Sequence, residues 1–505
     1  MKTSVIGYPR IGILRELKFA SEKYFRSEIG AEELLQTAKE LRKTHWLTQK
    51  NAGIDYISSN DFSHYDLVLD TAVMLGIIPK RYQELQLSEL DTYFAMARGY
   101  QGDSGDVKAL AMKKWFNTNY HYIVPEVEDD TKICLSNDKL WKEYEQAGAL
   151  GIETKPVVIG AYTMLKLCRY TGVKNEKNFI EDMVAAYKAL LDRCQKEAIN
   201  WIQIEEPALV QDMTKEDIEV FHAVYDALLP CKKDVHILLQ TYFGDVRDIY
   251  EDLLAMPFDG IGLDFLEGKE TVALIEKYGF AKDKILFAGL VNGKNIWKNH
   301  YDKTLQVLEG LRQKEIQVVL STSCSLLHVP YTLENEEKLA KEYLDHFAFA
   351  KEKLTELQEI GKLAEVKNYQ DEEAYRKNQK FFTRKRDCDH DEVKERLSKV
   401  TKKDYVRVPK RSSRQQLQKE VLGLGDFPTT TIGSFPQTKD VKANRSAYRR
   451  GEITRQEYVD FNKKKIADFQ GLFRDTKVSK VISGWMCLSM VNTNETTWLN
   501  ISEKH

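Results

Sequence analysis

Apolar and polar residues alternate along the first 330 positions in a pattern that predicts eight short strands. Each run is rich in β-branched residues and is bounded by turn-forming residues, as is typical of strands. The expected strands are residues 4–7, 54–57, 156–159, 201–204, 235–240, 260–264, 285–287 and 317–321. From the third strand onward, stretches of helical periodicity such as 178–198 and 302–315 lie between them.

Eight strands that alternate with helices are the count of a (β/α)8 barrel, so we expect an α/β fold of the TIM-barrel type. An insertion at about residues 58–155, which an ideal barrel does not need, separates the second and third strands. An open, doubly wound sheet is the alternative. The barrel is favoured because the strand count is right and no Gly-x-Gly-x-x-Gly motif follows the first strand.

The opening phrase TSVIGYPRIG (3–12) has a second version, TTTIGSFPQT, at 429–438. A repeat at such long spacing indicates a duplicated domain rather than a solenoid. From about Lys351 to the second copy, the sequence is strongly charged and helical in propensity, which is typical of connecting segments. We therefore expect a first barrel at 1–350, a helical linker at 351–424 and the start of a second barrel at 425–470. This second barrel is incomplete, since one strand cannot close a barrel.

Composition narrows the classes of partner. The chain has 75 Lys and Arg against 77 Asp and Glu, which gives no electrostatic reason to expect nucleic acid or a membrane surface. No apolar run approaches the ~20 residues that cross a bilayer, and the start lacks the apolar core of a secretory signal. The seven cysteines are scattered without a Cys-x-x-Cys pair, which fits reduced thiols. We expect a cytoplasmic protein.

Reactive residues of a (β/α)8 barrel lie at the C-terminal ends of its strands. The polar residues there are Arg10, Arg15, Lys18, Asn60, Asp61, Glu205, Glu206, Gln240, Tyr242, Asp264, Asn292, Ser323 and Cys324. Glu205 and Glu206 could suggest a glycosidase pair, but neighbours on an extended chain point to opposite faces. Asp264 could equally be a structural carboxylate that accepts backbone N–H groups, and Cys324 a plain buried thiol. DCDHDE at 387–392 has metal-ligand residue types, yet its pattern favours a solvated charge run.

Basic residues close to aromatic residues are the more informative set. Arg15 and Lys18 are three positions apart on an expected first helix, so they should share a face. Lys113 and Lys114 begin the aromatic-rich stretch MKKWFNTNYHY at 112–122. Cations beside aromatic rings suit a flat heterocycle with an anionic tail. A solvated basic patch over core aromatic residues is the alternative.

Seven motifs, taken in order, resemble the cobalamin-independent methionine synthase family. They are G-x-P-R-x-G-x-x-R-E-L-K (7–18), NDFSHYD (60–66), KWFNTNYHYIVPE (114–126), QIEEPAL (203–209), GLVNGKNIW (289–297), SCSLLHVPY (323–331) and TTTIGSFPQT (429–438). The similarity runs from residue 1 to about residue 470. It implies two face-to-face (β/α)8 barrels, of which the first is a degenerate duplicate of the second.

The resemblance also implies an activity and its partners. The family transfers a methyl group from 5-methyltetrahydropteroyltri-L-glutamate to L-homocysteine without cobalamin, and we expect a monomer. By resemblance, the folate contacts are Arg15, Glu16, Leu17, Lys18 and Lys114, and the homocysteine contacts are Ile432, Gly433 and Ser434. The cations would meet the carboxylates of the glutamate tail.

Zinc is implied because the thiol must attack as a thiolate and a coordinated metal ion deprotonates it. The family's zinc ligands, a His-x-Cys, a Glu and a distant Cys, belong to later strands of the second barrel. This chain ends before them, so we expect no metal site and no intact catalytic residues in it.

Residues 471–505 depart from the family pattern. Joining the last base of each codon to the first two of the next, Trp485–Met486 requires Asp, Met486–Cys487 requires Val, and Met490–Val491 requires Gly. These residues fit the family's D-V-x-V-H-G motif. We therefore interpret the tail as a frameshifted reading of the second barrel and expect the chain alone to be inactive. A non-catalytic folate-binding module and a hydrolase barrel are the alternatives.

Overall fold

The structure is a computed structural model that describes residues 1–384, 390–423, 425–427 and 437–475. The chain divides into two compact units, Met1–Arg384 and Lys385–His505. The first unit holds an eight-stranded sheet, whereas the described residues of the second unit form helices only.

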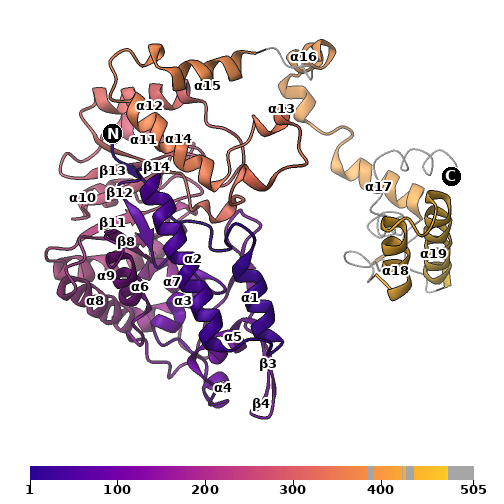
Figure 1. Cartoon of the computed structure of the whole chain (residues 1–505), viewed down its shortest axis with the longest axis horizontal. Helices are drawn as coiled ribbons and strands as arrows, with labels where there is room; N and C mark the ends of the chain where they lie inside the picture. The colour runs from indigo at the N-terminus through magenta and orange to yellow at the C-terminus, as the bar shows by residue number, and fades with distance from the viewer. Residues whose placement is uncertain (385–389, 424, 428–436, 476–505) are drawn as a thin grey trace. The chain divides into compact units, whose positions relative to one another are not determined.

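A parallel sheet forms the centre of the first unit, as Figure 1 shows. Its strands lie in the order β1-β14-β13-β12-β11-β10-β8-β2. They are β1 (Thr3–Ser4), β2 (Ile57–Ser59), β8 (Thr154–Ile159), β10 (Trp201–Glu205), β11 (His236–Gln240), β12 (Gly260–Asp264), β13 (Ile285–Val291) and β14 (Gln317–Thr322). A parallel bridge joins Ser4 to Tyr56, and the Tyr56 N–H donates to the Thr3 carbonyl at 3.0 Å. The sheet closes on itself, so the predicted (β/α)8 barrel is confirmed.

Two expected strands are offset from the observed ones. The runs at 4–7 and 54–57 share only Ser4 with β1 and Ile57 with β2. The residues before β2 complete the turn that follows a long helix, where the Ile54 N–H donates to the Gln49 carbonyl. The Asp55 carboxylate accepts the Thr3 N–H at 2.8 Å, so this turn also anchors β1.

The barrel interior changes from apolar to polar along the strands. Trp201 at the start of β10 packs inside the barrel with apolar side chains of three other strands, Leu238, Phe287 and Val319. Two residues further on, Gln203 hydrogen-bonds the amine of Lys155, and Glu205 follows after two more. Alternate residues of a strand share a face, so one side of β10 carries all three. The polar end of the interior is the C-terminal end, where barrel enzymes place their sites.

Helices cover the outside of the sheet (Figure 1). The helices of this unit outside the insertion are α1 (Glu16–Phe25), α2 (Ala31–Asn51), α6 (Lys139–Gly148), α7 (Ala161–Leu167), α8 (Ile180–Lys196), α9 (Lys215–Leu228), α10 (Tyr250–Ala255), α11 (Thr271–Tyr278), α12 (Tyr301–Gln313), α13 (Lys341–Leu344), α14 (Ala350–Leu363) and α15 (Glu373–Thr383). The helix α8 shows the pattern that buries one face, with Met183, Tyr187, Leu190 and Cys194 all inaccessible to solvent. No helix in the described part of the chain is long and apolar enough to span a membrane.

The predicted insertion forms a layer of short elements around its own small core. Its elements are α3 (Leu67–Met74), α4 (Lys80–Gln83), α5 (Glu89–Arg98), β3 (Tyr100–Gly102), β4 (Gly105–Val107), β5 (Met112–Lys114), β6 (His121–Ile123) and β7 (Glu126–Val127). The strands β3 and β4 form one antiparallel hairpin, β5 and β6 form another, and β7 pairs with β9 (Arg169–Tyr170). Leu69, Tyr82, Phe94 and Met96 pack together beneath them.

The first unit extends past the expected boundary at residue 350. Leu354, Leu357 and Ile360 of α14 are fully buried and join the main core of the barrel. The Asn378 side chain of α15 accepts the N–H of Tyr301 at 3.0 Å. The high charge of this segment misleads because α14 presents an apolar stripe on one face and charges on the other.

The second unit is described by its helices α16 (Asp391–Ser398), α17 (Arg411–Leu422), α18 (Lys439–Arg449) and α19 (Arg455–Asp475). The pair α18 and α19 is held by stacked rings of Tyr448 and Tyr458, 4.8 Å apart, and by an ion pair between Asp440 and Lys465. These are the helices that follow the second copy of the repeated phrase. The phrase itself and the tail from residue 476 lie outside the described residues.

The substitution Leu357→Ala tests whether α14 belongs to the folding unit of the barrel. We expect it to lower the free energy of unfolding by about 2–4 kcal/mol, because it leaves a cavity at a fully buried site. Urea unfolding followed by circular dichroism measures this. The matched control Leu35→Ala removes a side chain on α2 that is 47% exposed, and it should cost under about 1 kcal/mol. Equal effects of the two variants would show that α14 is a linker helix.

Candidate functional site at the C-terminal end of the barrel

Glu205 and Glu206 point to opposite sides of the barrel wall, as predicted. The Glu205 carboxylate lies inside, where it accepts hydrogen bonds from Gln203 at 2.8 Å and from the Tyr242 hydroxyl at 2.7 Å. Burial raises the pKa of Glu205 to about 7. The two carboxylates therefore cannot flank one bond, and the glycosidase interpretation loses its acid–base pair.

Glu206 anchors the helix α7 on the outside of the sheet. Its carboxylate accepts the Tyr162 N–H at 3.0 Å and the Thr163 N–H at 2.7 Å, both in the first turn of α7. The Tyr225 hydroxyl donates to it at 2.5 Å. A methyl group on Gly160 would lie 2.1 Å from a Glu206 carboxylate oxygen, so the glycine leaves space for this cap. The role of Glu206 is structural.

Asp264 and Cys324 also have structural surroundings. The Asp264 carboxylate accepts three backbone N–H groups, from Phe243 at 3.0 Å, Leu266 at 2.8 Å and Glu267 at 2.9 Å. Burial nevertheless raises the pKa of Asp264 to about 6. The Cys324 thiol is buried, and burial raises its pKa far above the ordinary value, so it is not a nucleophile in this state. Both structural interpretations from the sequence are confirmed.

Side chains fill the mouth of this barrel. A chamber of about 40 Å³ remains at the ends of the strands, lined by residues that include Arg10, Asp61, Trp115, Glu205 and His328. A volume of this size holds one or two water molecules. A folate-sized molecule does not fit into this chamber.

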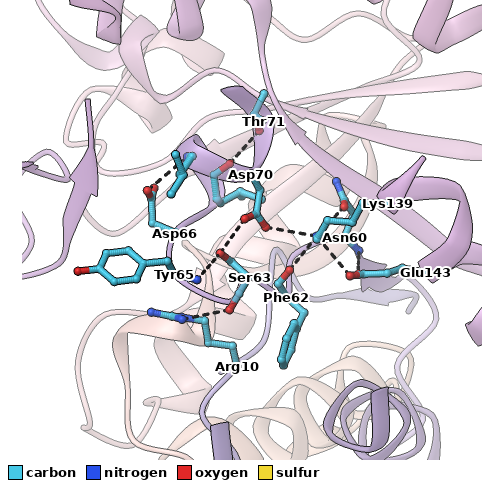
Figure 2. Close-up of polar contacts among 12 residues, drawn as sticks. Arg10, Asn60, Phe62, Ser63, Tyr65, Asp66, Asp70, Thr71, Lys139 and Glu143 are labelled. Carbon is cyan, nitrogen blue, oxygen red and sulfur yellow. Dashed lines mark hydrogen bonds and ion pairs between the residues drawn. The ribbon is translucent and has the colours of Figure 1, made fainter. Parts of the chain in front are cut away.

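An ion network lies beside the mouth, after β2 (Figure 2). The Lys139 amine donates to the Asn60 side chain at 2.8 Å and to the Phe62 carbonyl at 2.9 Å. It also pairs with Asp70 and Glu143, each at 3.3 Å. Burial alone would lower the pKa of Lys139, but Glu143 and Asp70 raise it above its ordinary value. Because the helix α6 supplies Lys139 and Glu143 four residues apart, it holds the loop after β2 in place.

A cavity of about 750 Å³ opens beside this network, between α2, α5 and α6. His64 lines it, and the Nδ1 atom of His64 is buried without a hydrogen-bond partner among the described residues. Burial, together with the cations Lys139 and Arg42, lowers the pKa of His64 to about 4. The histidine is therefore neutral at pH 7.

The four predicted folate residues at 15–18 span the end of the loop after β1 and the first turn of α1. They are of two kinds, those that shape the loop and those that carry positive charge. Leu17 is 2% exposed and packs in a small cluster with Ala38, Leu41 and Phe62. The Glu16 carboxylate accepts the Leu14 N–H at 3.0 Å. Leu17 and Glu16 therefore shape the loop.

Arg15, in the loop after β1, and Lys18, on α1, are the two cations of the motif. Arg15 does not lie on the expected helix face, because it precedes α1 in a left-handed conformation with φ 65°. Lys18 lies on α1, and its amine is 3.8 Å from Glu22. Arg15 is exposed and forms no ion pair with any residue that the structure describes.

Lys113 and Lys114 lie on β5 in the β5–β6 hairpin, where both are exposed. Neither side chain forms an ion pair within the described ranges. The aromatic residues that follow them in the chain pack on one another, since Trp115 lies edge-on against Phe116 with ring centroids 4.9 Å apart.

The predicted homocysteine contacts Ile432, Gly433 and Ser434 lie outside the described residues. Among the residues that the structure describes, no three His, Cys, Asp or Glu side chains are grouped so that they could hold a metal ion. These residues therefore do not fit the zinc that the family resemblance implies.

The sequence analysis missed the ion network around Lys139. The feature that could have indicated it is the spacing of four between Lys139 and Glu143 on an amphipathic helix. The same spacing is common on solvated helix surfaces, so it does not by itself predict a buried network.

Comparisons with known proteins agree with the motifs. The family model described as "Cobalamin-independent synthase, N-terminal domain" matches residues 2–316, and "Cobalamin-independent synthase, Catalytic domain" matches residues 427–486. The second match reaches into the segment 471–505 that the sequence analysis set apart.

Curated relatives are similar over most of this chain. A 5-methyltetrahydropteroyltriglutamate–homocysteine methyltransferase of Campylobacter jejuni subsp. doylei is 52% identical over 468 residues, which cover 93% of this chain and 62% of the relative. One from Lactococcus lactis subsp. cremoris is 49% identical over 484 residues, or 96% of this chain and 63% of the relative. The chain thus spans less than two thirds of their length. A solved B12-independent methionine synthase from a Shewanella species is 13% identical, with 71% of this chain and 97% of that chain covered and a TM-score of 0.49.

Replacing Lys139 by Met should destabilise the first unit by about 2–4 kcal/mol, because Asp70 would be left buried without its cation and Glu143 would keep only its contact with Arg42 at 3.7 Å. Thermal and urea unfolding measure the loss. The control Lys142→Met removes an amine of the same helix that pairs with Asp138 in an exposed position, and it should cost at most about 1 kcal/mol. A loss for Lys139→Met no greater than that of the control would contradict a structural role for the network.

The neutral state of His64 predicts a pH dependence. Its pKa is about 4 in the folded chain and about 6.5 when unfolded, so between these values only the unfolded state takes up the proton. Stability should therefore fall as the pH drops from 6.5 to 4. The variant His64→Gln should lose less stability over this range, by about 1–3 kcal/mol. Urea unfolding at pH 7, 5.5 and 4.5 gives the two curves, and parallel curves would refute this assignment.

Proposed function

Because the chain belongs to the cobalamin-independent methionine synthase family and contains its N-terminal domain with part of its catalytic domain, we propose a role in methyl transfer from 5-methyltetrahydropteroyltri-L-glutamate to L-homocysteine. Residues 1–384 would supply the folate side of this reaction. The observation that carries the proposal is 52% identity to a methyltransferase over 93% of the chain.

We propose that Arg15, Lys18 and Lys114 bind the carboxylates of the glutamate tail. In support, Arg15 and Lys114 are exposed cations without an ion pair among the described residues, and Lys18 has only a long contact with Glu22. An unpaired cation loses no internal partner when it binds an anion. Glu16 and Leu17 would act by shaping the loop that presents Arg15, so that of the four-residue motif only its two cations, Arg15 and Lys18, would touch the tail.

The transfer itself needs groups beyond those described. We propose that Ile432, Gly433 and Ser434 line the homocysteine site and that the zinc ligands are residues of the family's catalytic domain that this 505-residue polypeptide does not contain. When bound, zinc supplies a deprotonated, positioned thiol. The polypeptide of residues 1–505, assayed alone, would then bind folate without turning it over.

A non-catalytic folate-binding module remains the second candidate, and the filled mouth of the barrel favours it over a hydrolase. The two candidates share the tail site and differ in what a longer protein does. If a protein with the complete catalytic domain forms methionine, the methyltransferase proposal stands. If it only binds folate, the module is the better description.

The tail site predicts that affinity depends on the number of glutamates. We expect the 505-residue chain to bind the triglutamate form more tightly than the monoglutamate form. Each of Arg15→Met, Lys18→Met and Lys114→Met should weaken triglutamate binding by about 3- to 10-fold, the effect of one charge-assisted contact, with little effect on the monoglutamate. Calorimetry at low and high salt measures this.

Lys314→Met, on an exposed lysine after α12, is the matched control and should leave both affinities unchanged. The same preparation with added homocysteine and zinc should form no methionine. Equal affinity for the two folates would overturn the tail site, and zinc-dependent turnover by homogeneous protein of this length would overturn the proposed inactivity.

A further inference from the structure

We infer that Glu267 and Lys294 are positioning residues for folate binding, because they fix the tip of the β5–β6 hairpin that presents Lys114. The inference rests on the proposed function of Lys114. It assigns a role to two charged residues that come from the loops after β12 and β13, far from the hairpin in sequence.

The hairpin is short. Its strands pair Met112 with Ile123, Lys113 with Tyr122 and Lys114 with His121, and beyond this ladder the Trp115 N–H donates to the Tyr120 carbonyl at 2.7 Å. A two-stranded hairpin is marginally stable in water, so its conformation depends on contacts with the rest of the protein. On the tip side, the Tyr120 hydroxyl donates to the Tyr65 carbonyl at 3.1 Å.

Three polar side chains, Asn117, Glu267 and Lys294, hold the tip in place, and we call this cluster the clasp. The Asn117 amide donates to the Glu267 carboxylate at 2.7 Å, and the Lys294 amine donates to the Asn117 carbonyl oxygen at 2.7 Å. Lys294 also contacts both carboxylate oxygens of Glu267, at 2.7 and 2.9 Å. All three members bond to one another, and the side chains of Lys294 and Glu267 are only 23% and 29% exposed. A partly buried, mutually bonded set is screened less than a solvated ion pair.

The two loops that carry the clasp are themselves rigid. Asp264 accepts the backbone N–H of Glu267 at 2.9 Å, and Asn292 accepts the backbone N–H of Lys294 at 2.8 Å. Each anchor stands at the C-terminal end of its strand, so the barrel wall sets the position of the clasp. The polar residues at the ends of β12 and β13 act through these loops.

Backbone strain at the tip supports the same role. Phe116 and Phe243 have φ angles of 48° and 74°, a left-handed region that costs a bulky residue energy. Their rings lie 6.1 Å apart, and the Lys294 amine lies 5.1 Å from the Phe243 ring centroid. Such conformations persist where the surroundings over-determine them. The clasp, next to Phe116 in the chain, supplies that restraint.

The consequence for Lys114 is preorganisation. Lys114 is three residues from Asn117, and a cation held on a fixed strand loses less freedom on binding than one on a mobile loop. Glu267 and Lys294 need not touch the ligand. Their loss should weaken the tail contact of Lys114 and leave the pterin-bearing part of the folate unaffected.

The test compares Glu267→Ala and Lys294→Met with a control that breaks a solvated ion pair, Lys282→Met, whose partner is Glu315. Hydrogen exchange of the amides of residues 115–122 measures the hairpin, and calorimetry measures binding of the mono- and triglutamate forms of 5-methyltetrahydrofolate. We expect both clasp variants to speed exchange and to weaken triglutamate binding by about 3- to 10-fold, with monoglutamate binding unchanged. The double variant Glu267→Lys with Lys294→Glu, which swaps the two charges, should restore part of the slow amide exchange and part of the triglutamate affinity.

The possible results distinguish three claims: that the clasp exists, that it positions Lys114, and that Lys114 binds the folate tail. Unchanged hairpin exchange in both clasp variants, at an unchanged melting temperature, would overturn the clasp whatever the folate result. Faster exchange with unaltered triglutamate affinity, while Lys114→Met weakens binding, would overturn the positioning role alone. No effect of Lys114→Met would overturn the proposed function of Lys114 instead, and the exchange data would still report on the clasp.

Discussion

Closure of the barrel between its two shortest strands is the constraint on which the rest of the structure depends. The strand β1 contributes only Thr3 and Ser4, and a single bridge joins it to the segment before β2. Side chains add what the backbone lacks. Asp55 accepts the Thr3 N–H from one side, and inside the barrel the Lys155 amine donates to the Val5 carbonyl at 2.8 Å.

Lys155 is a buried charge that is unfavourable in itself but connects three segments of the barrel through its hydrogen bonds. It is 1% exposed, and burial lowers its pKa to about 7, so the interior resists its charge. Its hydrogen bonds to Val5 and Gln203 connect β8, the residues after β1, and β10 across the interior. The loops that carry Arg15, the network of Lys139 and the clasp all begin at strand ends that this closure places.

The sequence predicted the barrel well because parallel strands buried on both faces are short apolar runs. The sequence analysis was wrong where a residue pattern fits more than one local structure. The charges of α14 suggested a linker, since exposed and buried faces of an amphipathic helix are mixed in the sequence. Arg15 was expected on a helix face, but Gly12 with φ 83° and Glu16 set a turn that no helical periodicity encodes. The network of Lys139 depends on residues up to 83 positions apart, such as Asn60 and Glu143, which local patterns cannot pair.

The pairing of Glu206 with Gly160 has a consequence for how this sequence can change over time. The carboxylate occupies the space that a larger residue at 160 would need, and it also satisfies two amides of α7. A side chain at 160 is acceptable only after the glutamate has shortened, and a shorter residue at 206 leaves the two amides unsatisfied. Each single step therefore passes through a less stable intermediate, so these two sites should evolve as a coupled pair and substitutions at them should be rare.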